Sequence, residues 1–84
     1  MRVTIKFYAS LAVYLPAIAR ATNQHHTDLP IGITVAAALA PYGLPPELTK
    51  LVLVNGHYIG EEERPNRVLS EGDVLAVWPP IAGG

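Results

Sequence analysis

The sequence contains no cysteine, which excludes disulfide bonds, thiol nucleophiles and cysteine-ligated zinc sites. No apolar run approaches the roughly 20 residues that a membrane-spanning helix needs, and the first residues lack the apolar segment of a signal peptide. Charge is also sparse, because only 15% of residues are charged and the basic ones are dispersed. Phosphate neutralisation needs clustered Lys and Arg, so nucleic acid is not an expected partner. These absences predict a cytoplasmic protein that binds neither membrane nor nucleic acid.

What the chain does contain is apolar residues. Half of its 84 residues are hydrophobic, which is enough for one small core without a metal or a disulfide. With so few charges, some apolar side chains are expected on the surface. We expect one folded domain over residues 1–78 and an extended C-terminal tail over residues 79–84.

The first half of the chain alternates between strand and helix patterns. Period-two alternation predicts a strand over residues 2–8, and apolar residues at helical spacing follow in 10–15, with Ser10 as the expected N-cap. The polar stretch 23–29 predicts an edge strand. Thr34 is the expected N-cap of a short alanine-rich helix.

That helix is predicted over residues 35–40, with Val35, Ala38 and Leu39 on its apolar face, and Pro41 ends it. Beyond it, Pro46 suits the first position of a further helical turn.

The second half predicts a hairpin and a last strand. Residues 51–54 form an apolar run of strand length, Asn55-Gly56 is a strong hairpin-turn dipeptide, and 57–59 is the returning strand. Residues 61–66 are predicted to form a solvated loop, and 74–78 the final strand.

Together these elements predict an α+β roll, a mixed sheet of four or five strands with one main helix on one face. In the strands 51–54 and 74–78, the even and the odd positions are both apolar, so both sheet faces carry apolar side chains there. So short a helix covers one sheet face only. Either the other face presents an exposed apolar patch, which commonly marks a partner site, or the segment 10–18 folds over it. The sequence leaves both alternatives open.

The chain ends in a slim tail. Gly83 and Gly84 have no Cβ, so they form a thin and pliable chain end with an unhindered carboxylate. Pro79 and Pro80 lack a backbone N–H and have a fixed φ, which favours an extended exit from the last strand. Trp78 precedes them as either a core residue or a docking anchor. The pattern predicts a terminus that enters the active site of another protein.

Three segments resemble the small ubiquitin-like β-grasp sulfur carriers. Residues 3–11 are similar to the family's first strand running into a short helix. Residues 53–56 (Leu-Val-Asn-Gly) and 69–77 (Leu-Ser-Glu-Gly-Asp-Val-Leu-Ala-Val) are similar to its paired Val-Asn-Gly and Gly-Asp motifs. Residues 78–84 resemble the tail of the small subunit of molybdopterin synthase, although Trp78 stands where Phe is more usual. The resemblance implies a ubiquitin-like β-grasp roll.

The resemblance also implies a chemistry. An E1-like adenylyltransferase uses ATP to adenylate the Gly84 carboxylate, and a sulfur-donating enzyme then converts it to a thiocarboxylate. The tail inserts into the large subunit of molybdopterin synthase and gives its sulfur to the molybdenum cofactor precursor. The chain is then a non-catalytic co-substrate that binds no cofactor itself. The residues expected to contact the partners are Trp78, Pro79, Pro80, Ile81, Ala82 and Gly83.

Several other functions stay open. A carrier for thiamin thiazole, tungsten cofactor or tRNA thiolation, and a ubiquitin-like modifier of lysines, would use the same activated tail. An interaction module with an inert terminus is a third class. His25, His26 and His57 could be considered a metal set, but a metal site is not expected, because adjacent histidines on a strand point to opposite faces.

Overall fold

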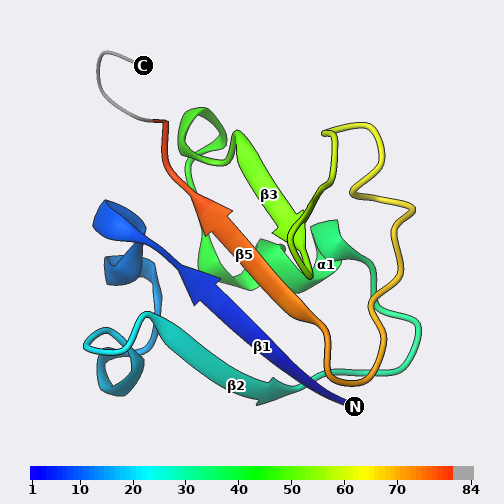
Figure 1. Cartoon of the computed structure of the whole chain (residues 1–84), viewed down its shortest axis with the longest axis horizontal. Helices are drawn as coiled ribbons and strands as arrows, with labels where there is room; N and C mark the ends of the chain where they lie inside the picture. Colours follow the sequence, from blue (N-terminus) through cyan, green and yellow to red (C-terminus); the bar gives the residue numbers. More distant parts are fainter. Residues whose placement is uncertain (81–84) are drawn as a thin grey trace.

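The first and last strands lie side by side in the middle of the sheet. In the computed structural model, which describes residues 1–80, β1 (Arg2–Phe7) pairs antiparallel with β2 (Gln24–Asp28) and parallel with β5 (Val74–Trp78). β3 (Leu51–Val54) pairs antiparallel with β5, and β4 (His57–Tyr58) pairs with β3. The strand order is therefore β2-β1-β5-β3-β4 (Figure 1). This is the mixed sheet that the sequence predicts.

Alternation along each strand decides which face is buried. On β1, Val3, Ile5 and Phe7 are fully buried, whereas the residues between them are only partly covered. The same alternation runs through β3 and β5. The buried members there are Val52, Val54, Leu75 and Val77. All of them belong to one core, on the face against which the helix packs.

The helix α1 (Val35–Leu39) crosses that face behind the sheet (Figure 1). Its N-cap is Thr34, whose Oγ1 accepts a hydrogen bond from the Ala37 N–H at 3.2 Å, as the sequence predicts. The predicted apolar face of the helix is buried in the core. A 3₁₀ turn, η3 (Ala40–Tyr42), continues it, and Gly43 ends the run with φ of 67°.

The segment after β1 differs from its prediction. It forms two 3₁₀ turns, η1 (Ala9–Tyr14) and η2 (Ala17–Ala19), and the N-cap of η1 is Tyr8 without a side-chain hydrogen bond, so Ser10 is not the cap. Leu11 and Leu15 are buried in the same core as α1. This segment therefore completes the core at the end of β1 and leaves the second sheet face uncovered.

The connection into β3 begins with η4 (Pro46–Leu48), where Pro46 takes the first position as expected. None of the helices that the structure describes has the length and apolar character needed to cross a membrane.

The two motif segments bind each other. Asn55 Oδ1 accepts from the Val74 N–H at 2.9 Å, and Asn55 Nδ2 donates to Asp73 Oδ1 at 2.9 Å. The hairpin turn needs positive φ at both central residues, 51° at Asn55 and 83° at Gly56. Asp73 Oδ2 also accepts from the Ser70 N–H at 2.8 Å. These bonds fix where β5 starts and explain why Asn-Gly and Gly-Asp occur together.

Candidate functional site

The candidate site begins where β5 ends. Trp78 is the last residue of β5 and pairs with Leu51, the first residue of β3, so the chain leaves the sheet between two ordered strands. Pro79 and Pro80 follow outside any strand, as their missing N–H groups require. The remaining predicted site residues, which lie outside the described part of the chain, are Ile81, Ala82, Gly83 and Gly84.

An aromatic stack supports this exit point. The ring of Trp78 lies parallel to that of Tyr8, with centroids 3.8 Å apart and an interplanar angle of 8°. The Tyr8 N–H also donates to the Val77 carbonyl at 3.1 Å, which ties the chain after β1 to the end of β5. Sequence analysis did not single out Tyr8. Its position in the alternation could have identified it, because Tyr8 follows Thr4 and Lys6 in the series of residues that face outward.

The sheet face opposite α1 carries an exposed apolar area next to the exit. Trp78 is 41% exposed, Leu51 42% and Tyr58 56%, and the strand register places them around partly covered neighbours. We call this surface the open face. Its residues are Leu51, Leu53, Tyr58, Val74, Ala76 and Trp78. Of the two alternatives left by the sequence, the exposed patch is correct. Exposed apolar patches commonly mark partner sites.

The other half of the same sheet side is polar. Arg2 pairs with Asp28 (Nε to Oδ1, 3.1 Å), and Thr4 Oγ1 shares a hydrogen bond of 2.9 Å with His26 Nδ1. Lys6 pairs with Ala76 across β1 and β5, so it stands next to the open face. The apolar open face is therefore bordered by polar residues of β1 and β2.

A groove on the α1 side contains the second departure from the sequence predictions, the buried side chain of Arg64. Its lining includes Ala36, Thr49, Lys50, Glu61 and Arg64, with a volume of about 290 Å³. The loop 61–66 was expected to be solvated, yet one of its side chains is buried. The exposed fraction of Arg64 is 8%.

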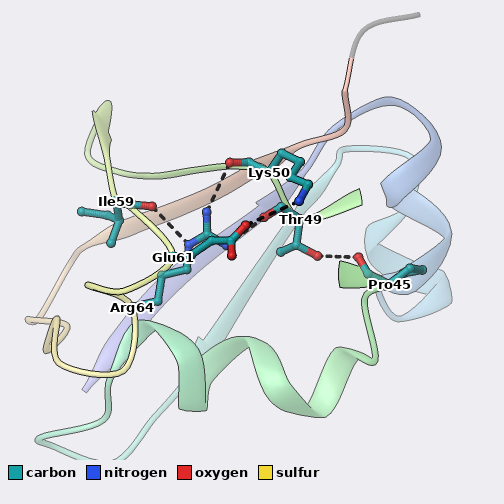
Figure 2. Close-up of polar contacts among 6 residues, drawn as sticks. All are labelled: Pro45, Thr49, Lys50, Ile59, Glu61 and Arg64. Carbon is teal, nitrogen blue, oxygen red and sulfur yellow. Dashed lines mark hydrogen bonds and ion pairs between the residues drawn. The ribbon is translucent and has the colours of Figure 1, made fainter. Parts of the chain in front are cut away.

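Backbone carbonyls explain that burial. Arg64 donates from Nε to the Ile59 carbonyl at 3.1 Å, from Nη1 to Thr49 at 2.8 Å and from Nη2 to Lys50 at 3.2 Å (Figure 2). A planar guanidinium suits three carbonyls at fixed angles. Arg64 therefore clamps the loop to the residues that lead into β3. We interpret the clamp as structural, since it satisfies groups that burial would otherwise leave unpaired.

The described residues offer little catalytic chemistry. Within residues 1–80, no three His, Asp or Glu side chains gather closely enough to hold a metal. His25 and His26 point to opposite faces of β2, one towards Tyr42 and the other towards Thr4. Burial raises the pKa of the Tyr42 phenol, but Tyr42 packs edge-on against Phe7 on the α1 side of the sheet, the face opposite to Trp78. What the site offers is an exposed apolar face beside the point where the chain leaves the sheet.

Solved structures share this architecture. The small archaeal modifier protein SAMP1 of Haloferax volcanii superposes with a TM-score of 0.67 at 22% identity, over 100% of both chains. A putative molybdopterin converting factor subunit 1 of Pyrococcus furiosus gives 0.65 at 21% identity, over 96% of this chain and 99% of that one. At these identities the likeness establishes the fold, and the predicted β-grasp roll is confirmed.

A third structure is a complex of subunits 1 and 2 of the molybdopterin-converting factor of Helicobacter pylori, which gives 0.61 at 19% identity over 100% of both chains. No curated protein matches the chain by sequence. The ThiS family model, in contrast, matches residues 13–84, which is most of the chain and includes its last residue. The resemblance to the ubiquitin-like sulfur carriers is thereby confirmed, and the chain belongs to the ThiS family.

Proposed function

We propose that this protein is a sulfur carrier whose C-terminal Gly84 is activated as an acyl-adenylate and then converted to a thiocarboxylate. The observation that carries the proposal is the family match, which extends through the Gly-Gly terminus to residue 84. The structure supports it with an exposed apolar face at the point where the chain leaves the sheet.

The chemistry explains why a partner has to activate the tail. A terminal carboxylate is ionised at neutral pH and is a poor electrophile. In the first step its oxygen attacks the α-phosphate of ATP, and pyrophosphate leaves. In the second step a sulfur nucleophile attacks the acyl carbon and AMP leaves. If the donor is a persulfide, a thiol then cleaves the acyl disulfide and leaves the thiocarboxylate.

Each partner in the proposal has a surface to recognise. An E1-like adenylyltransferase and a sulfur-donating enzyme supply the catalytic groups, and the chain contributes the tail and the open face. Trp78 and Tyr8 form an aromatic base beside the exit, and aromatic residues of this kind dominate interface energetics. ATP is consumed by the partner and is not a cofactor of this chain. A cytoplasmic location is part of the proposal, because the activation consumes ATP.

For the sulfur acceptor we propose the large subunit of molybdopterin synthase. The tail Trp-Pro-Pro-Ile-Ala-Gly-Gly resembles that of the synthase's small subunit. Two structural neighbours are described as subunit 1 of a molybdopterin-converting factor, and one of them is seen in complex with subunit 2. On this proposal the chain is the non-catalytic small subunit of the synthase, with residues 79–84 inserted into the large one.

A second candidate function is protein modification. Two of the similar structures are of a small archaeal modifier protein, SAMP1 of Haloferax volcanii. The same activated Gly84 would then form an isopeptide bond with a lysine amine. A modifier accumulates in conjugates of higher mass, whereas a carrier accumulates only the thiocarboxylate.

The first test is mass spectrometry of the intact protein after incubation with ATP, an E1-like enzyme and a persulfide donor. We expect a species heavier by one oxygen-to-sulfur exchange, located in the C-terminal peptide. An unchanged carboxylate would overturn the proposal. Conjugates in place of the thiocarboxylate would favour the modifier function.

A pair of tail variants tests whether the tip is threaded into a narrow channel. Gly83→Val adds a β-branched side chain, which stiffens and widens the tip, and should abolish activation without affecting folding. Ile81→Val is the matched control, because it keeps a branched side chain of similar size where one already stands. Equal activation of both variants would count against threading.

A further inference from the structure

β2 forms an outer edge of the sheet, and no further strand among residues 1–80 pairs with it (Figure 1). The hydrogen-bonded pairs that flank β2 show which of its residues bond to β1. Met1 bonds to Leu29 at one end, and Phe7 bonds to Asn23 at the other. Because bonded and non-bonded pairs alternate in an antiparallel ladder, His25 and Thr27 bond to β1.

The main-chain groups of Gln24, His26 and Asp28 therefore point outward. Among the described residues, their only hydrogen bond on that side is a 3.5 Å contact from Thr22 Oγ1 to the Gln24 carbonyl. The outward row is thus free to pair with another strand.

The two edges of the sheet differ in how they are protected. β4 is two residues long, which is too short to template a further strand. β2 has five residues, contains no proline or lysine, and keeps Gln24, His26 and Asp28 exposed. Natural proteins usually blunt such an edge with a proline, a bulge or an inward-pointing charge. The intact edge of β2 indicates a pairing surface.

We propose that β2 pairs with β2 of a second copy of this chain, antiparallel and centred on His26. In this register His26 faces His26 of the second copy, and Gln24 faces Asp28 at both ends. Every outward N–H and C=O of the three residues then finds a partner. A register shifted by two residues would leave one residue of each copy unpaired, so the centred register is preferred.

The side chains of this register are complementary. The Asp28 carboxylate already accepts from Arg2 on one side, and the amide of Gln24 from the second copy would donate to it from the other. Lys6 of the second copy, which pairs with that Gln24, extends the row with a second positive charge. Opposite pairs of this kind stabilise neighbouring strands. The row Arg2, Asp28, Gln24, Lys6 thus recurs at both ends of the pairing.

The pairing does not involve the end of β5. β1 separates β2 from β5, so the exit at Trp78 and the open face stay exposed in both copies. The inference is therefore independent of the proposed function. Pairing of two five-residue strands buries far less surface than a standard interface, so the dimer should be weak and depend on concentration.

Sedimentation velocity from micromolar to millimolar concentration tests the proposal. The wild-type chain should shift from monomer to dimer, and His26→Pro should remain monomeric. Proline at 26 removes an outward N–H but no N–H that bonds to β1. His26→Thr is the matched control, because it keeps the N–H and should still dimerise. A wild-type chain that stays monomeric at millimolar concentration overturns the proposal, as does equal dimerisation of both variants.

Two substitutions at Gln24 test the register without relying on proline. Gln24→Asn keeps an uncharged amide opposite Asp28 at both ends and should leave the dimer nearly as tight as in the wild type. Gln24→Asp places like charges there and should weaken it several-fold. If the two variants dimerise equally, β2 is not the interface. A dimer that responds only to Trp78→Ala would likewise assign association to the open face and overturn the proposal.

Discussion

The two sides of β5 are chemically similar in sequence but differ in what they do. Leu75 and Val77 point towards α1 and are fully buried, whereas Val74, Ala76 and Trp78 point to the open face. Both sets are apolar. The side that a helix covers holds the fold together, and the side without a helix presents a surface beside the tail exit. Burial rather than hydrophobicity therefore decides which side chains of this strand stabilise the fold.

The largest expected effect is on the covered side. Leu75→Ala should lower the free energy of unfolding by about 3 kcal/mol, because it removes buried methyl groups and leaves a cavity. Urea denaturation followed by circular dichroism measures it. Val74→Ala, on the open side, is the matched control and should cost about 1 kcal/mol or less. Equal losses for the two variants would contradict the comparison.

The next largest effect is expected at Arg64, which holds the loop 61–66 in place on the α1 side of the sheet. Arg64→Met should cost about 2 kcal/mol, because the carbonyls of Ile59, Thr49 and Lys50 lose a charged donor. Arg64→Lys should recover only part of the loss, since an ammonium group cannot bond to three carbonyls in one plane. The same denaturation assay measures both. Full recovery with Lys would show that charge alone matters at this position.

The open face should contribute less to stability. Trp78→Ala should cost about 1 kcal/mol, because it removes the stack on Tyr8 from a partly exposed site. Trp78→Phe keeps an aromatic ring and should fall between Ala and the wild type. In Trp78→Ala, the free energy of binding to the activating enzyme should fall by much more than the free energy of unfolding. A stability loss as large as that of Leu75→Ala would place Trp78 in the core.

The smallest effect is a pH dependence on the covered side. Burial raises the pKa of Tyr42, so the native state keeps its phenol proton where the unfolded chain loses it. The stabilisation is complete below the ordinary tyrosine pKa of about 10 and is lost as pH rises through the raised value. The melting temperature, measured by thermal unfolding between about pH 9 and pH 11, should therefore fall less steeply with pH in Tyr42→Phe than in the wild type. Parallel curves would contradict this assignment.

Local patterns predicted most of the fold because each rests on a short-range rule. Thr34 caps α1, Asn55-Gly56 makes the hairpin turn, and the alternation in β1 identifies the buried residues. The failures have long-range causes. Ser10 suits an N-cap by residue type, but the core contacts of Leu11 and Leu15 accompany 3₁₀ turns there.

The candidate site divides in the same way. The sequence identified Trp78 and the two prolines, since proline chemistry ends a strand wherever it occurs. It did not identify Tyr8, which reaches Trp78 only because β1 and β5 are parallel neighbours. Ile81, Ala82, Gly83 and Gly84 are assigned by the sequence alone, and their role stays a prediction.

By itself the sequence determined the strands, the capped helix, the paired motif segments and the form of the tail, because these depend on residues close together in the chain. Tertiary structure decided which of the two apolar sides of β5 is covered, that Arg64 is buried, and which strand edge stays open. Those outcomes depend on where one short helix, one loop and the last strand come to lie. Their contacts join residues that are distant along the chain, so no local pattern contains them.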